Sequence, residues 1–141
     1  MKKEIKKENS AIIVSQISTN KKGTGYIKDP NNPNKDIIVE SISLLNTAMN
    51  GDIVEVKLGN KNQYGQITAE VTKIVERKRN SFVCTIENQN GKLLAIPDDR
   101  KAYFPISISN SNLNIGDKVY VKVNEWKDYK DMPVGEIIKI L

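Results

Sequence analysis

Apolar and polar residues alternate along most of this chain with a period of two, which is the pattern of half-buried β-strands. In the first half the alternating runs are 11–18, 36–42, 52–58 and 67–75, and in the second half they are 81–87, 92–97, 105–109, 118–123 and 135–141. Asn, Gly, Pro and Lys separate the runs and favour turns. Ser43–Asn50 (SLLNTAMN) is the one candidate helical turn, between the third and fourth strands. The pattern predicts an all-β protein of nine or ten short strands.

The pattern also repeats. Gly51–Lys57 and Gly116–Lys122 share the motif GDxVxVK, and Glu70–Val75 matches Glu136–Leu141 at nearly the same spacing of about 65 residues. Each unit would hold five strands, which suits a five-stranded Greek-key barrel of the OB type. We therefore predict two tandem OB-type barrels. The expected divisions are a basic lead-in at residues 1–9, a first barrel at 10–78 and a second barrel at 79–141, joined through the polar run 76–80.

Composition narrows the classes of function. The 141 residues carry a net charge of +5, which favours polyanionic partners such as nucleic acids. The chain has no histidine, so it cannot form a Ser-His-Asp or Cys-His catalytic site or a Cys/His zinc site. No apolar run is long enough for a membrane span, so we expect no membrane contact and a cytoplasmic location.

The sequence around the cysteine and around the carboxylates indicates structural roles for these residues. The single cysteine, Cys84, excludes an internal disulfide and alternates with Phe82 and Ile86, so it is interpreted as a small core residue. Asp98 and Asp99 lie among basic residues in turn-like sequence, as do Asp128 and Asp131. We interpret both pairs as solvated turn residues rather than metal ligands.

The stretch KKGTGYIKD (Lys21–Asp29) is the main candidate for chemistry. It falls between the first and second strands, beside the usual ligand face of an OB barrel. Two lysines could meet phosphates, and two glycines could let a ligand approach the backbone closely. The simpler reading is a hairpin turn whose tyrosine caps the barrel. Alternation favours Ile27 inside and Tyr26 outside, where the ring could stack on a base.

Several ordered motifs carry a resemblance to a known family. They are GTGY at 23–26, DIIV at 36–39, AMNGDIV at 48–54, IPDDR at 96–100, GDKV at 116–119 and PVGEIIKIL at 133–141. From about Ser10 onwards, the chain resembles the tandem cold-shock domains that precede the catalytic domain in ribonuclease II and ribonuclease R, which are bacterial 3′-to-5′ exoribonucleases. Thr24 and Ile38 stand where the family usually has stacking aromatics, so Tyr26 is what remains of that cluster.

The resemblance implies binding and guiding of single-stranded RNA by a non-catalytic region. The expected RNA-binding residues are Lys21, Lys22, Gly23, Gly25, Tyr26, Lys28, Lys35 and Ile38. No catalytic residue, metal ligand or cofactor is expected in this segment, because the family's magnesium-binding aspartate cluster has no counterpart here. Magnesium is expected for the parent enzyme's catalytic domain, which should follow in cis beyond Leu141.

Two other functions are compatible with the same residues. One is a free-standing RNA-binding or RNA-chaperone protein with two OB domains, and the other is a protein-interaction module.

Three further aromatics could also contact RNA. Trp126 more often covers a barrel core at such a position, whereas for Tyr103 and Phe104 the two roles are equally compatible with the sequence.

Overall fold

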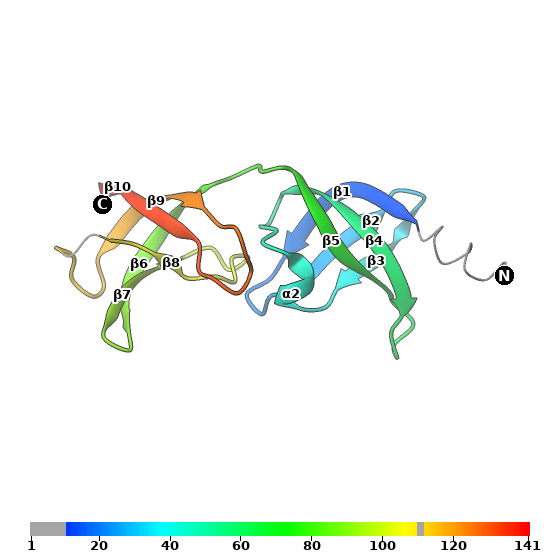
Figure 1. Cartoon of the computed structure of the whole chain (residues 1–141), viewed down its shortest axis with the longest axis horizontal. Coiled ribbons are helices and arrows are strands. Elements are labelled where there is room, and N and C mark those ends of the chain that lie inside the picture. The colour runs from blue at the N-terminus through cyan, green and yellow to red at the C-terminus, as the bar shows by residue number, and fades with distance from the viewer. Residues whose placement is uncertain (1–10, 110–111) are drawn as a thin grey trace.

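The computed structural model describes residues 11–109 and 112–141, so the predicted lead-in at residues 1–9 lies outside the described residues. Two small β-barrels lie side by side along the long axis of the molecule, and an extended segment connects them (Figure 1). The described residues form ten strands and one short helix. The prediction of an all-β chain with two OB-type barrels is confirmed.

The first barrel closes in the strand order β1-β2-β3-β5-β4. Its elements are β1 (Ile12–Thr19), β2 (Gly25–Asp29), β3 (Asn32–Val39), α2 (Ile42–Leu45), β4 (Ile53–Lys61) and β5 (Ile67–Glu76). All neighbouring pairs are antiparallel except β3 and β5, which run parallel and close the barrel. This is the Greek-key connection expected of an OB-type barrel.

The second barrel repeats this order as β6-β7-β8-β10-β9. Its strands are β6 (Ser81–Gln89), β7 (Lys92–Pro97), β8 (Ile106–Ser107), β9 (Lys118–Glu125) and β10 (Val134–Ile140). Again a single parallel pair, β8 with β10, closes the barrel. The polar run begins at Glu76, the last residue of β5, and residues 77–80 connect this strand to β6.

The third strand and the helix differ from the predicted bounds. The strand spans Asn32–Val39 rather than 36–42, because the chain leaves it to begin α2. The side chain of Ser41 accepts a hydrogen bond from Leu44 N and caps this helix. The helix ends at Leu45 rather than Asn50, because Asn46 and Thr47 adopt left-handed backbone angles, with φ of 49° and 67°.

The GD motif forms the same turn in both barrels. Gly51 and Gly116 have φ of +91° and +93°, a conformation that glycine adopts without strain. Gly51 N donates to Ile17 O, and Gly116 N donates to Ile86 O, each at 2.8 Å. In both turns the aspartate side chain accepts from the backbone N–H three residues earlier. The repeated sequence thus folds into a repeated structure.

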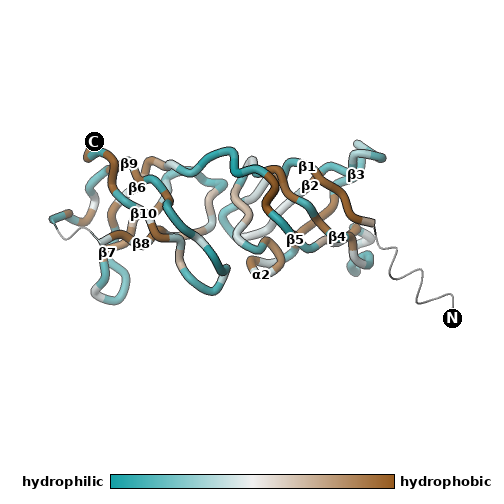
Figure 2. The backbone as a smooth tube through the Cα atoms, turned by 45° about the horizontal axis from the view of Figure 1, so that its top comes forward, coloured by the Kyte–Doolittle hydropathy of each residue, from teal (hydrophilic) through white to brown (hydrophobic). Residues whose placement is uncertain are grey.

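Each barrel has its own apolar core, and the two cores touch. Figure 2 shows hydrophobic residues along the strands and hydrophilic residues in the connecting segment and hairpins. Met49 belongs to the first barrel by sequence but packs in the core cluster of the second. Tyr103 contacts both clusters and donates its hydroxyl to Ala48 O at 2.6 Å. Thr19 Oγ1 donates to Lys101 O at 2.5 Å. These contacts fix the barrels against each other.

Candidate nucleic-acid interface

The outer face of β2 and β3 presents the predicted tyrosine. Tyr26 lies opposite Ile38 on β3 and opposite Ser18 on β1. The Tyr26 side chain is 37% exposed, whereas Ile27 is only 1% exposed. Alternation along β2 therefore turns Tyr26 outward, as predicted, and Ile38 lies beside it on the same face.

A shallow hollow of about 370 Å³ adjoins Tyr26. Ser15, Gln16, Ser18, Lys28 and Asp36 also line it. Lys28 Nζ lies 3.6 Å from Asp36 Oδ1, and both side chains are largely exposed. Because such a surface ion pair contributes little free energy, Lys28 can exchange this carboxylate for a phosphate at small cost.

The two glycines of the candidate stretch have structural roles. Gly23 has φ of +87° in the β1–β2 turn, and a Cβ there would lie 2.4 Å from Ile42 Cγ1. A Cβ on Gly25 would lie 2.7 Å from Leu45 Cδ2 and 2.8 Å from Ile17 Cδ1, inside the barrel. Turn geometry and core packing account for both glycines without a ligand. The hairpin interpretation therefore holds for the glycines, while Tyr26 remains outward.

Asn20 organises the turn that carries Lys21 and Lys22. Its side-chain oxygen accepts from Lys22 N at 3.0 Å and from Thr24 N at 3.1 Å. Both lysines are exposed, and the turn faces the second barrel near Asp98. The pKa of Asp98 is lowered mainly by a hydrogen bond from Lys118, then by one from Thr85, with a smaller effect of the Lys21 charge.

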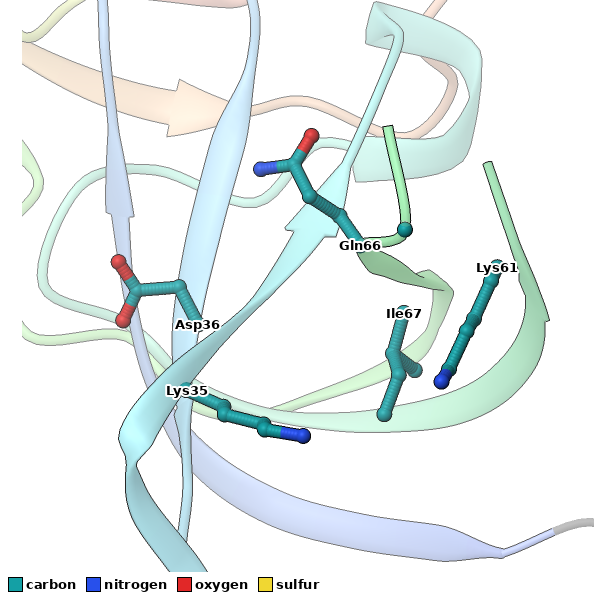
Figure 3. Close-up of a pocket in the computed structure, with 6 residues that line it drawn as sticks. Lys35, Asp36, Lys61, Gln66 and Ile67 are labelled. Atoms are coloured by element: carbon teal, nitrogen blue, oxygen red, sulfur yellow. The ribbon is translucent and has the colours of Figure 1, made fainter. Parts of the chain in front are cut away.

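The predicted lysines do not form one groove. Lys28 shares the outer face with Tyr26, and Lys21 and Lys22 lie on the turn towards the second barrel. Lys35 lines a different hollow, together with Lys61 (Figure 3). The structure therefore brings Tyr26, Lys28 and Ile38 together and separates Lys35 from them.

A buried ion pair at the joint between the barrels was not predicted. Asp52 Oδ2 accepts from Arg77 Nη1 at 2.6 Å, and the Asp52 side chain is 0% exposed. Arg77 Nη1 also donates to Thr47 O at 2.8 Å. Burial raises the pKa of Asp52, and a hydrogen bond from Met49 N and the charge of Arg77 offset part of that effect. The polar run 76–80 indicated a joint between the barrels, but no sequence pattern predicted that Arg77 pairs with Asp52.

The other aromatic candidates are structural. Phe104 is 5% exposed, and Tyr103 lies between the two cores. Trp126 packs against the second core and donates its indole N–H to Asp131 O at 2.9 Å. These three side chains form a cluster of ring contacts with centroid distances of 4.9 to 5.9 Å. Phe104 is therefore a core residue, and Tyr103 packs the two barrels together.

Cys84 is a core residue, as predicted, whereas Asp98 and Asp99 are ion-paired rather than simply solvated. Cys84 is buried, and burial raises its thiol pKa to about 12. Asp98 and Asp99 form ion pairs with Lys118 and Arg79 at 2.7 Å. Within residues 11–109 and 112–141, no three carboxylate or cysteine side chains gather as a metal site. Over the same residues, none of the helices has the length and apolar character that a membrane crossing requires.

Comparisons with known proteins agree with this architecture. The cold-shock domain family CSD2 matches residues 95–141. Ribonuclease R of Buchnera aphidicola is 28% identical over 139 residues, covering 95% of this chain and 19% of that protein. The resemblance to ribonuclease R is confirmed. The chain thus spans about a fifth of the length of this ribonuclease R.

Solved structures share the two-barrel fold. The apo form of Mycoplasma genitalium ribonuclease R superimposes with a TM-score of 0.72 at 19% identity, over 92% of this chain and 21% of that one. The same enzyme in complex with ribose methylated single-stranded RNA gives the same values. Yeast Ssd1, a pseudonuclease, gives a TM-score of 0.77 at 15% identity, over 99% of this chain and 24% of that one.

Proposed function

We propose that the two barrels bind single-stranded RNA and guide it towards the catalytic domain of a ribonuclease R-like 3′-to-5′ exoribonuclease. The observation that carries this proposal is the outward pair Tyr26 and Ile38 on β2 and β3, with Lys28 beside it. An exposed ring on this face of an OB barrel offers a stacking surface for a base. In this proposal the chain contributes binding, and bond cleavage with magnesium belongs to the catalytic domain.

The composition of the face sets the expected mode of binding. Tyr26 offers one stacking ring, and Ile38 can add only apolar contact at the neighbouring position. The lysines of the first barrel then supply much of the affinity through phosphate contacts, which depend on salt and little on base sequence. We therefore expect weak sequence preference and strong salt dependence.

The comparisons support RNA as the ligand and leave catalysis as a separate question. Ribonuclease R of M. genitalium has been solved with single-stranded RNA. The fold also occurs in yeast Ssd1, a pseudonuclease. Two barrels of this kind are therefore compatible with RNA binding whether or not the parent protein cleaves RNA. A bacterial source and a cytoplasmic location remain predictions from the sequence.

A second candidate function concerns the other barrel. On its outer face Val83 lies opposite Tyr120, and both are more than a third exposed, as is Ile138 on the adjacent strand β10. Exposed apolar side chains on neighbouring strands are typical of surfaces that contact protein, and Lys118 and Lys122 lie on either side of Tyr120 on the same face of β9. This observation supports a protein-docking role for the second barrel beside RNA binding by the first.

The deciding experiment compares two tyrosines of equal exposure. Tyr26 is 37% and Tyr120 38% exposed, and they lie on different barrels. Binding of a fluorescent oligouridylate of about twelve nucleotides is measured by anisotropy at several salt concentrations. Tyr26→Ala should weaken binding by about 1–3 kcal/mol, the range for one stacked base. Because the proposed stacking surface lies on the first barrel, Tyr120→Ala should weaken binding less than Tyr26→Ala does.

Urea denaturation of both variants completes the test. An outward ring should leave the unfolding midpoint of Tyr26→Ala close to that of the parent protein, whereas a ring that filled the core would cost about 3–5 kcal/mol. Salt should weaken binding with a log-log slope of about −0.7 for each phosphate contacted. Equal affinities for the two variants, or binding that does not respond to salt, would refute RNA binding by this face.

A further inference from the structure

The duplicated chain carries the same outward sheet face twice, once on each barrel. The first face is formed by β1, β4 and β5, with β4 in the middle, and the second face by β6, β9 and β10, with β9 in the middle. Both faces contain a β-bulge at the same place, where Thr72 is the extra residue of β5 and Ile138 that of β10. Glu55 and Tyr120 lie beside these bulges, each three residues after the aspartate of its GD turn. Glu55 and Tyr120 are thus equivalent, as are Thr72 and Ile138.

The middle of the first face is polar. Thr72 Oγ1 donates a hydrogen bond to Glu55 Oε2 at 2.8 Å across the bulge. Ile12 and Val14 are exposed on this face too, but both lie on β1, at its side. Hydrogen-bonding groups therefore occupy the middle of the first face, and water can contact them without loss.

The middle of the second face is apolar. Tyr120 and Ile138 stand where the first face has its hydrogen-bonded pair, and they are 38% and 52% exposed. Val83 lies opposite Tyr120 on β6 and is exposed as well. Apolar surface in water carries a cost of about 25 cal/mol for each Å², which contact with apolar groups of a partner removes. Neighbouring exposed apolar side chains of this kind mark an interaction site.

The charges around the two middles also differ. On the first face two glutamates lie opposite two lysines, Glu55 with Lys73 and Glu70 with Lys57. On the second face the outward charges are three lysines and one glutamate, namely Lys118, Lys122, Lys139 and Glu136.

Two of the three lysines on the second face have no counter-charge. Lys118 Nζ lies 2.7 Å from Asp98 Oδ2. Across residues 11–109 and 112–141, neither Lys122 nor Lys139 has a carboxylate within ion-pair distance. The second face therefore combines an apolar middle with positive charge around it. A surface complementary to it has apolar groups in the middle and carboxylates at the edge.

We propose that the second face docks an acidic protein segment, whose apolar side chains cover Tyr120 and Ile138 and whose carboxylates meet Lys122 and Lys139. This inference rests on the second candidate function and is independent of RNA binding at Tyr26. Tyrosine is enriched among the residues that dominate binding energy at protein interfaces, so Tyr120 suits the role of anchor. The lysines would accelerate association with an acidic partner and disfavour a basic one.

The first face supplies the control variant for the test. Tyr120→Glu/Ile138→Thr gives the second face the pair that Glu55 and Thr72 form in the same bulge, so the double variant should fold. Its urea denaturation midpoint checks this. Lys122→Gln and Lys139→Gln change the charge alone and leave the apolar middle intact. Lys57→Gln is their matched control, because Lys57 occupies on the first face the place of Lys122 on the second.

The probes are short peptides selected on the full chain from a random display library. We expect the selected peptides to combine apolar residues with Asp and Glu. Measured by fluorescence anisotropy, their affinity should fall at least about 10-fold in Tyr120→Glu/Ile138→Thr, as for the loss of a dominant interface residue. Lys122→Gln and Lys139→Gln should slow association, and Lys57→Gln should not. Tyr26→Ala should bind the peptides as the parent does.

The contrary outcomes can be told apart. If the selected peptides bind through this face but are basic or uncharged, the acidic partner is refuted and the docking function stands. If no peptide is selected, or if the double variant binds the peptides as the parent does, both are refuted. If the double variant loses as much affinity for the oligouridylate as for the peptides, the second face binds RNA and the docking inference is wrong.

Discussion

The GD turn occurs in both barrels, but only the first one carries a buried ion pair, between Asp52 and Arg77. The second turn therefore serves as an internal control for the contribution of this ion pair to the unfolding free energy. Asp52 and Asp117 occupy the same position in the two turns, and each accepts from the backbone N–H three residues earlier, at 2.8 and 2.9 Å. Asp52 accepts in addition from Arg77 Nη1 and from Lys78 N. The variants Asp52→Ala and Asp117→Ala therefore remove the same local hydrogen bond, and the first also removes the link to the joint.

The expected magnitudes follow from these partners. Asp117→Ala loses one hydrogen bond at a half-buried site, about 1 kcal/mol of unfolding free energy. Asp52→Ala removes the carboxylate partner of Arg77, which keeps only Thr47 O, and leaves two backbone N–H groups without their acceptor. Breaking a buried pair costs about 3–5 kcal/mol. Because the Arg77 side chain stays 28% exposed and can be hydrated, we expect about 3 kcal/mol. The two variants should differ by about 2 kcal/mol, roughly 1 M in urea midpoint.

The assay is urea denaturation followed by tryptophan fluorescence. Trp126, the single tryptophan of the chain, lies in the second barrel and contacts Tyr103, which also packs against the first. The fluorescence of Trp126 should therefore change when the contact between the two barrels is lost. The double variant Asp52→Ala/Arg77→Ala should cost less than the sum of its single changes, because no unpaired guanidinium remains. If Asp52→Ala costs no more than Asp117→Ala, the joint makes no net contribution and the reasoning fails.

Two further predictions concern packing and pH. Gly25→Ala should destabilise the protein by about 1–3 kcal/mol through overpacking against Leu45 and Ile17, and an unchanged urea midpoint would show that these side chains move apart freely. The pKa of Asp99 is lowered mainly by a hydrogen bond from Lys101 N, so its stabilising effect is present above about pH 3.8 and lost as pH falls further. Denaturation midpoints of Asp99→Asn should therefore approach those of the parent at low pH, and a constant difference would contradict this.

The all-β class, the duplication and the direction of Tyr26 could be predicted from the sequence because they are local properties. A period of two assigns alternate side chains to opposite faces of a strand, so Ile27 inside places Tyr26 outside. The GD motif recurs because the same left-handed glycine and the same aspartate hydrogen bond form the same turn in both barrels. The end of α2 was missed because Asn46 and Thr47 take left-handed angles that apolar periodicity does not encode.

The grouping of the charged and aromatic side chains depended on the tertiary structure. Lys35 and Lys61 share a hollow because β3 pairs with β5 when the barrel closes, which brings the β4–β5 hairpin beside the start of β3. Tyr103 and Met49 join the two barrels because surfaces distant in sequence meet there, and Arg77 meets Asp52 at the same joint. Alternation assigns each residue a face of its own strand, but barrel closure and packing between barrels decide which side chains meet across strands.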